Sequence, residues 1–122
     1  MFRTLEVIDV DTSARRVVVT AAKLKSNMLS VNNIRWSHDG RSIAFDFRTE
    51  DEAAKSNVAV VSYPGGALRW LTRDGKSKLP HWSADGRSVL YIRADSEIRS
   101  VDEDGRNDRL LSSLAGCLSS KQ

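Results

Sequence analysis

Apolar residues occur along the chain in short runs that are bounded by Gly, Pro, Asp, Asn or Ser. Ile43-Ala44-Phe45, Val58-Ala59-Val60-Val61 and Val89-Leu90-Tyr91 are examples. Such lengths and residue types are typical of β-strands, and no window keeps the 3.6-residue period and the caps of a helix. Runs that alternate only loosely favour sheets with both faces covered. The pattern predicts an all-β chain of about ten short strands.

One segment of the chain recurs. Residues 33–45 read N-I-R-W-S-H-D-G-R-S-I-A-F, and residues 79–91 read L-P-H-W-S-A-D-G-R-S-V-L-Y. Trp36 and Trp82 stand 46 residues apart. A period in the forties combined with short strands predicts a β-propeller blade rather than a helical solenoid.

Each copy of this segment contains a hairpin signal. Asp39-Gly40 and Asp85-Gly86 are flanked by apolar runs. Gly accepts left-handed backbone angles and Asp hydrogen-bonds to turn amides, so we expect both pairs at hairpin tips. Ser37 and Ser83, two residues earlier, are expected to bond to turn amides as well.

A second half of the repeat follows each copy. Residues 58–72 and 98–112 each contain two apolar runs around a Gly-containing turn, and residues 5–18 match the same half. We therefore predict one domain over residues 1–122, with a half blade at about 5–20, blades at about 33–72 and 79–112, and a tail at 113–122. A closed propeller usually needs 4–8 blades, so we expect a partial propeller, either a fragment or a chain that self-associates.

These residues resemble the TolB-type propeller repeat, whose signature is Trp-Ser-Pro-Asp-Gly followed by a basic residue. Residues 36–41 and 82–87 reproduce it, except that His38 and Ala84 replace the Pro. The resemblance implies four-stranded antiparallel blades. Similar repeats occur in the periplasmic TolB protein, in propellers that precede prolyl-oligopeptidase-type hydrolase domains, and in bacterial kinase or regulator chains. It therefore implies the bacterial periplasm or a soluble domain of a larger protein.

Charge and cysteine content exclude several classes of protein. The net charge of +3 comes from 19 basic and 16 acidic residues that are interspersed along the chain, which argues against a nucleic-acid footprint. Cys117 is the single cysteine, so no internal disulfide forms. We expect neither a signal peptide nor a membrane span, because no apolar run has the required length.

The sequence offers little catalytic chemistry. It lacks a G-x-S-x-G elbow and a glycine-rich phosphate loop, and Cys117 has no recognisable histidine partner. His38 and His81 occupy non-equivalent repeat positions, which disfavours a metal site. Residues 102–108 suggest a calcium loop at first, but an acidic hairpin tip fits their spacing better. We expect no catalytic residue, cofactor or metal, and we expect Trp36 and Trp82 to pack in the core.

The function predicted from these observations is a non-catalytic interaction module that binds a protein, peptide or glycan partner. The alternative is a regulatory or substrate-gating propeller of a larger hydrolase or kinase. In propellers of this family the first strand of each blade is innermost, so the resemblance places residues 23–35 and 74–81 beside the central channel. The candidate partner-binding residues there are Asn32, Asn33, Arg35, Lys76, Lys78 and His81. Such a surface favours an anionic or amide-rich partner, and the alternative is that these are ordinary solvated residues.

Overall fold

A computed structural model describes residues 5–19, 28–49 and 52–113. Ten strands and no helix lie in this part of the chain, which confirms the all-β prediction. The strands, in chain order, are β1 (Leu5–Ile8), β2 (Arg15–Val19), β3 (Met28–Trp36), β4 (Ser42–Thr49), β5 (Glu52–Ser62), β6 (Leu68–Trp70), β7 (Ser77–Trp82), β8 (Ser88–Arg93), β9 (Glu97–Asp102) and β10 (Arg109–Ser113).

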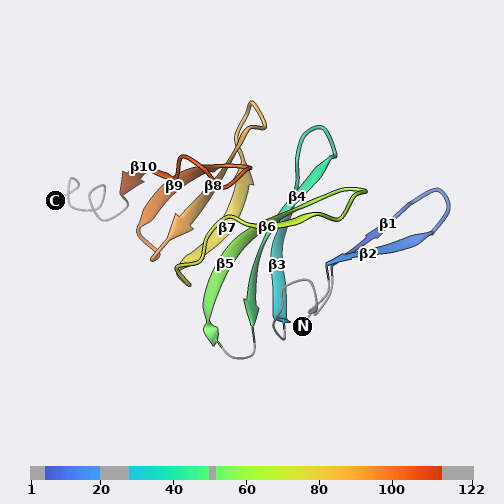
Figure 1. Ribbon diagram of the computed structural model, residues 1–122, viewed down its shortest axis with the longest axis horizontal. Coiled ribbons are helices and arrows are strands. Elements are labelled where there is room, and N and C mark those ends of the chain that lie inside the picture. Colours follow the sequence, from blue (N-terminus) through green and yellow to red (C-terminus); the bar gives the residue numbers. More distant parts are fainter. Residues whose placement is uncertain (1–4, 20–27, 50–51, 114–122) are drawn as a thin grey trace.

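The strands form three antiparallel sheets. Strands β3 to β6 form one four-stranded sheet in chain order, the first blade, and β7 to β10 form another, the second blade. Strands β1 and β2 form a two-stranded half blade. In Figure 1 the half blade lies on one side of the first blade and the second blade on the other. The sheets do not close into a ring.

Strand β4 contributes buried side chains to both faces of the first blade, because its side chains alternate. Ile43, Phe45 and Phe47 point into a cluster that also contains Leu5 of the half blade. Ala44, between them, points into a second cluster with Tyr91 and other apolar residues of the second blade. A two-residue period with apolar side chains on both faces is what a sheet stacked between neighbours requires. The first blade therefore packs against the second on one face and against the half blade on the other.

The two Asp-Gly turns form hairpin tips as predicted. Gly40 and Gly86 have φ of 73° and 75°, and their amides donate to the carbonyls of Ser37 and Ser83 at 3.0 and 2.9 Å. The Ser37 Oγ accepts the amide of Ser42 at 3.0 Å and donates to Asp39 Oδ1 at 2.7 Å. The second turn repeats these bonds, so the same residues build the same loop twice.

The expectation that both repeated tryptophans lie in the core is wrong for Trp36. Trp82 is partly buried and packs against the cluster between the blades. Trp36 keeps 45% of its surface exposed, although Tyr63 contacts its ring edge-to-face at a centroid distance of 5.4 Å. The physical reason lies in the neighbouring sheets. Trp36 lies on the face of the first blade that packs against the two-stranded half blade, whereas Trp82 packs against the four-stranded first blade.

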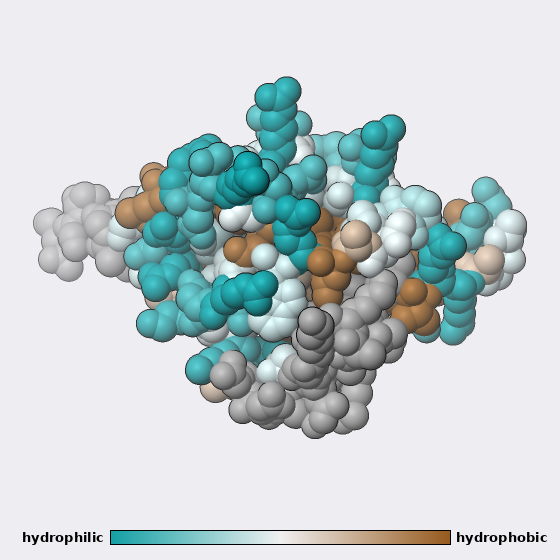
Figure 2. Space-filling model, viewed as in Figure 1, coloured by the Kyte–Doolittle hydropathy of each residue, from teal (hydrophilic) through white to brown (hydrophobic). Residues whose placement is uncertain are grey.

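The surface of the described residues is mostly hydrophilic. Figure 2 shows smaller hydrophobic areas near the middle of one face, beside β10 and beside the β1–β2 hairpin. Exposed apolar side chains on these elements include Ile8, Val17, Leu110 and Leu111. No helix in the described part of the chain has the length and apolar character needed to cross a lipid bilayer.

Candidate functional site

The six candidate residues lie on or beside the first strands of the two blades. Asn32, Asn33 and Arg35 belong to β3, Lys78 and His81 belong to β7, and Lys76 comes directly before β7. Both strands are the terminal strands of their sheets. We call these six residues the inner-strand surface.

The structure does not gather the inner-strand surface into one cluster. Arg35 lies opposite Ala44, whose side chain faces the second blade. His81 lies opposite Leu90, on the face of the second blade that is turned away from Val89 and Tyr91. Arg35 and His81 thus lie on the equivalent face of each blade and are separated by the thickness of the second blade, so the two side chains do not meet.

Several side chains of the inner-strand surface already have partners. Asn33 Nδ2 donates to Asp46 Oδ2 at 2.8 Å, and Asn32 Nδ2 donates to Ser30 Oγ at 3.1 Å. Lys78 forms an ion pair with the exposed carboxylate of Asp95. The His81 side chain is exposed and the Arg35 side chain is half-buried. Exposed ion pairs are weak, so Lys78 keeps the ability to bind another anion.

A backbone feature of both first strands was not predicted from the sequence. Asn33 and Leu79 occupy equivalent repeat positions and have φ of 53° and 58°, within breaks in the strand register. A bulge at this point re-aims the residues that follow it. The residues that follow it in the two blades are Ile34 and Pro80.

Asp46 connects the two bulges, and this role was also not predicted from the sequence. Its side chain is 4% exposed, and its Oδ2 accepts from Asn33 Nδ2 and from the Leu79 amide at 2.9 Å. The first bond lies within the first blade and the second crosses to the second blade. The sequence carries a signal for this role, because Asp46 interrupts the apolar run from Ile43 to Phe47. A buried acid in a strand requires hydrogen-bond donors.

A second bond across the blades comes from Trp82. Its indole Nε1 donates to the backbone carbonyl of Arg35 at 3.0 Å. Together with the Asp46–Leu79 bond, it fixes β7 against the first blade. We call these two bonds and the apolar cluster around Ala44 and Tyr91 the interblade seam.

Ion pairs fix the strands of the second blade to one another. They run in a chain from Asp74 through Arg93, Glu97 and Arg99 to Asp108, with N–O distances of 2.8 to 3.4 Å. Asp108 also accepts a hydrogen bond from the hydroxyl of Tyr91. Burial and the carboxylate of Asp108 raise the pKa of Tyr91 above its usual range. The positive charges of Arg93 and Arg99 are balanced by the carboxylates they pair with, so these two residues do not form a basic patch.

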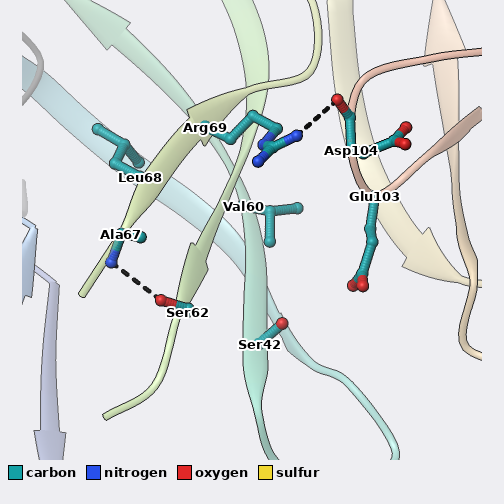
Figure 3. A pocket seen from close by; sticks show the side chains of 8 residues that line it. All are labelled: Ser42, Val60, Ser62, Ala67, Leu68, Arg69, Glu103 and Asp104. Carbon is teal, nitrogen blue, oxygen red and sulfur yellow. Dashed lines mark hydrogen bonds between the residues drawn. The ribbon is translucent and has the colours of Figure 1, made fainter. Parts of the chain in front are cut away.

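A shallow pocket of about 210 Å³ lies at the outer strands, away from the inner-strand surface. Figure 3 shows Arg69 of β6 facing Glu103 and Asp104 of the β9–β10 turn across this pocket. Arg69 Nη1 donates to the Asp104 carbonyl at 2.7 Å. Arg69 is the side chain of this pocket that would bind an anion, and it already donates one hydrogen bond to the backbone of the second blade.

The β9–β10 turn is a hairpin tip, as the spacing of residues 102–108 predicted. The Gly105 amide donates to the Asp102 carbonyl at 2.8 Å, and Asp104 Oδ1 accepts the Arg106 amide at 2.9 Å. Asn107 Nδ2 donates to Asp102 Oδ2 at 2.7 Å. The acidic side chains thus serve the turn itself. Among the described residues, no three His, Cys, Asp or Glu side chains lie close enough together to hold a metal ion.

Known proteins resemble the chain in both sequence and structure. The Tol-Pal system protein TolB 1 of Novosphingobium aromaticivorans is 40% identical over 60 residues, which is 45% of this chain and 13% of that protein. The crystal structure of TolB from Acinetobacter baumannii superposes with a TM-score of 0.64 at 21% identity, over 89% of this chain and 26% of that one. The β-propeller domain of the Trilobed protease from Pyrococcus furiosus superposes with a TM-score of 0.62 at 16% identity, over 89% of this chain and 34% of that one.

The chain is built from TolB-like β-propeller blades. No protein-family model matches its sequence. The chain is also similar to the uncharacterized peptidase YuxL of Bacillus subtilis, to which it is 42% identical over 71 residues, or 57% of this chain and 10% of that protein. The chain thus spans between a tenth and a seventh of the length of these two relatives.

Proposed function

We propose that this chain is a non-catalytic interaction module whose inner-strand surface binds a protein, peptide or glycan partner. The observation that carries the proposal is the position of β3 and β7. Each is the terminal strand of a TolB-like blade, and each has polar side chains along it. The terminal strand of a sheet has backbone groups that are free to pair with an added peptide strand, while side chains along it supply specificity.

The charge of this surface favours an anionic or amide-rich partner. Arg35 and Lys78 are cationic, and Asn32 and His81 are exposed polar side chains. Charges at the rim of an interface act mainly on recognition and on the rate of association. A place in a Tol-Pal system, as in the TolB relative, would offer protein partners, and a periplasmic location agrees with this proposal.

A peptide display library tests the proposal. Peptides selected on the purified chain are measured for affinity against the parent protein and against the double variant Arg35→Ala with Lys78→Ala. We expect the affinity of the variant to fall by about tenfold or more if both cations contact the peptide. Circular dichroism melting verifies that the variant is folded.

A matched control removes two exposed arginines far from the surface. Arg106→Ala with Arg109→Ala changes the net charge by the same amount on the β9–β10 hairpin. We expect this control to bind the peptides as the parent does. Equal affinity of a folded Arg35→Ala/Lys78→Ala variant would reject the inner-strand surface.

A second candidate function is a propeller that gates or positions substrate for a larger enzyme. The likeness to a Bacillus subtilis peptidase over 71 residues favours it, as does the likeness to a protease propeller. The gene that encodes this chain distinguishes the two functions, through the sequence that surrounds the segment in the same reading frame. A catalytic domain in frame would support the gating function, and an independent frame with a signal peptide would support the binding module.

A further inference from the structure

An arginine on the last strand of one sheet binds the next sheet at two equivalent places. Arg16 of β2 and Arg69 of β6 each pair with a valine whose side chain points toward the following sheet. Arg16 Nη1 donates to the Pro64 carbonyl at 3.1 Å, and Arg69 Nη1 donates to the Asp104 carbonyl at 2.7 Å. We call the contact around Arg16 the first junction and the contact around Arg69 the second junction. Because both junctions share this bond, their differences come from other residues.

The residue before each acceptor carbonyl differs between the two junctions. Tyr63 and Glu103 are equivalent, since their amides donate to the carbonyls of Arg41 and Arg87 at 2.8 and 3.1 Å. At the first junction, Tyr63 packs against the apolar cluster of the first blade and contacts Trp36. At the second junction, Glu103 is exposed, and its carboxylate has no hydrogen bond or ion pair to any described residue. A charged group thus stands where the first junction has a packed aromatic ring.

The shallow pocket of about 210 Å³ lies at the second junction and combines apolar side chains with two opposite charges. Val60 and Leu68 are among its apolar lining residues, and Figure 3 shows Arg69 and Glu103 on different sides of Val60. A guanidinium has several N–H donors, so the bond to Asp104 leaves Arg69 with donors for a ligand. Pockets for drug-sized ligands are larger, roughly 300–1,000 Å³, so this pocket suits a smaller molecule.

We propose that the pocket at the second junction binds a small zwitterion, namely a free α-amino acid with an aliphatic side chain. The carboxylate of the ligand pairs with Arg69, because a guanidinium binds a carboxylate through two parallel hydrogen bonds. Its ammonium group pairs with Glu103, and its side chain lies against Val60 and Leu68. This site is separate from the inner-strand surface and does not depend on the function proposed for that surface.

The pair of opposite charges selects this ligand class over a simple anion or a simple cation. An anion on Arg69 would be repelled by the carboxylate of Glu103, and a cation on Glu103 would be repelled by the guanidinium of Arg69. A ligand that carries both charges satisfies both side chains. Because Arg69 and Glu103 are exposed, water weakens these pairs, and we expect a dissociation constant of about 1 mM.

The test titrates the full ¹⁵N-labelled chain with three probes that share one side chain. They are L-leucine, L-leucinamide, which lacks the carboxylate, and isocaproate, which lacks the ammonium group. We expect L-leucine to shift the amide signals of Ala67, Leu68 and Glu103, and each analogue to bind about tenfold more weakly or less. Absence of shifts with L-leucine, or binding of either analogue as tight as that of L-leucine, would overturn the proposal.

Variants of Glu103 locate the site of the ammonium group. Glu103→Gln should weaken L-leucine binding by about tenfold, because it removes the negative charge. Glu103→Tyr gives the second junction the residue of the first and should abolish binding. Asp11→Asn is the matched control, since it removes one negative charge from the exposed β1–β2 turn and should leave binding unchanged.

Variants of the two junction arginines separate ligand binding from stability. Arg69→Lys and Arg16→Lys alter the same kind of bond between sheets, so thermal unfolding should show similar losses of stability. Only Arg69→Lys should weaken L-leucine binding, by about tenfold, because lysine lacks the planar fork that binds a carboxylate. Unchanged binding by folded Arg69→Lys and Glu103→Gln, or an equal loss in Arg16→Lys, would overturn the proposal.

Discussion

The two blades have nearly the same first hairpin, yet their tryptophans have different surroundings. Trp82 is held between two sheets and hydrogen-bonded to Arg35, whereas Trp36 has an exposed ring that Tyr63 contacts at one edge. The local sequence determines the strand, the turn and the direction of the side chain. The neighbouring sheet determines whether that side chain stabilises the fold. The comparison teaches that the repeat motif specifies which side chains form a contact surface. How much these side chains stabilise the fold depends on the sheet that precedes them in the chain.

The largest expected difference between the blades is in the stability cost of removing each tryptophan. Trp82→Ala should lower the free energy of unfolding by about 3 kcal/mol, because it leaves a cavity and an unpaired carbonyl in the seam. Trp36→Ala should cost less, about 1 kcal/mol, because 45% of the surface of Trp36 is exposed. Urea unfolding measures both variants. Equal losses would show that the two blades are packed alike.

Asp46 gives the next largest effect. Asp46→Ala should cost about 2 kcal/mol, since the Leu79 amide and the Asn33 side chain lose a buried acceptor. Asp46→Asn should recover part of this loss, because its amide oxygen still accepts from Leu79. Thermal unfolding of the two variants tests the assignment. If Asn and Ala at position 46 cost the same, the bond to Leu79 does not hold the blades together.

The turns should respond equally in both blades. Gly40→Val and Gly86→Val should each cost about 1–3 kcal/mol, because a β-branched residue is strained at positive φ. No atom lies within 4 Å of a Cβ built at either position, so the cost is that of the backbone alone. Thermal stability of the two variants is the measurement. A neutral effect at both sites would contradict the turn geometry.

Much of the fold could be predicted from the sequence, because the features concerned are local. Asp-Gly turns and apolar runs fix the hairpins within a few residues, and the 46-residue spacing relates one blade to the next. Strand limits were less certain: β3 begins at Met28 and β7 at Ser77, earlier than the predicted blade starts near 33 and 79.

The features that could not be predicted depend on residues distant in the chain. Leu79 takes a positive φ, which few leucines do, and its amide is bound by Asp46 from the neighbouring blade. The exposure of Trp36 depends on the number of strands in the sheet before it. The candidate partner-binding residues follow from the family resemblance, and their role stays a prediction.

The smallest effect concerns pH. The hydroxyls of Ser37 and Ser83, followed by the amides of Arg41 and Arg87, lower the pKa of Asp39 and Asp85 from the usual 3.8. Because the folded pKa values are the lower ones, the charged carboxylates stabilise the fold above pH 3.8, and this contribution disappears as the pH falls through the folded values.

The double variant Ser37→Ala with Ser83→Ala tests this contribution. In this variant the unfolding midpoint should change less with pH in the acidic range than it does in the parent protein. The two single variants should contribute equally, because the turns are alike. Unfolding midpoints between pH 2 and pH 6 provide the data. An unchanged acidic limb in the double variant would show that the serine hydroxyls do not set these pKa values.

The central claim is that Trp82 is covered by the first blade, whereas Trp36 faces the two-stranded half blade and stays partly exposed. Hydrogen exchange of the two indole N–H groups tests this claim most directly. In the full chain, the Trp82 indole proton should exchange slowly, since it is bonded to the Arg35 carbonyl at 3.0 Å. The Trp36 indole proton should exchange at close to the rate of a solvent-exposed indole. Equal protection of both protons would contradict the account, because it would mean that a neighbour already covers Trp36.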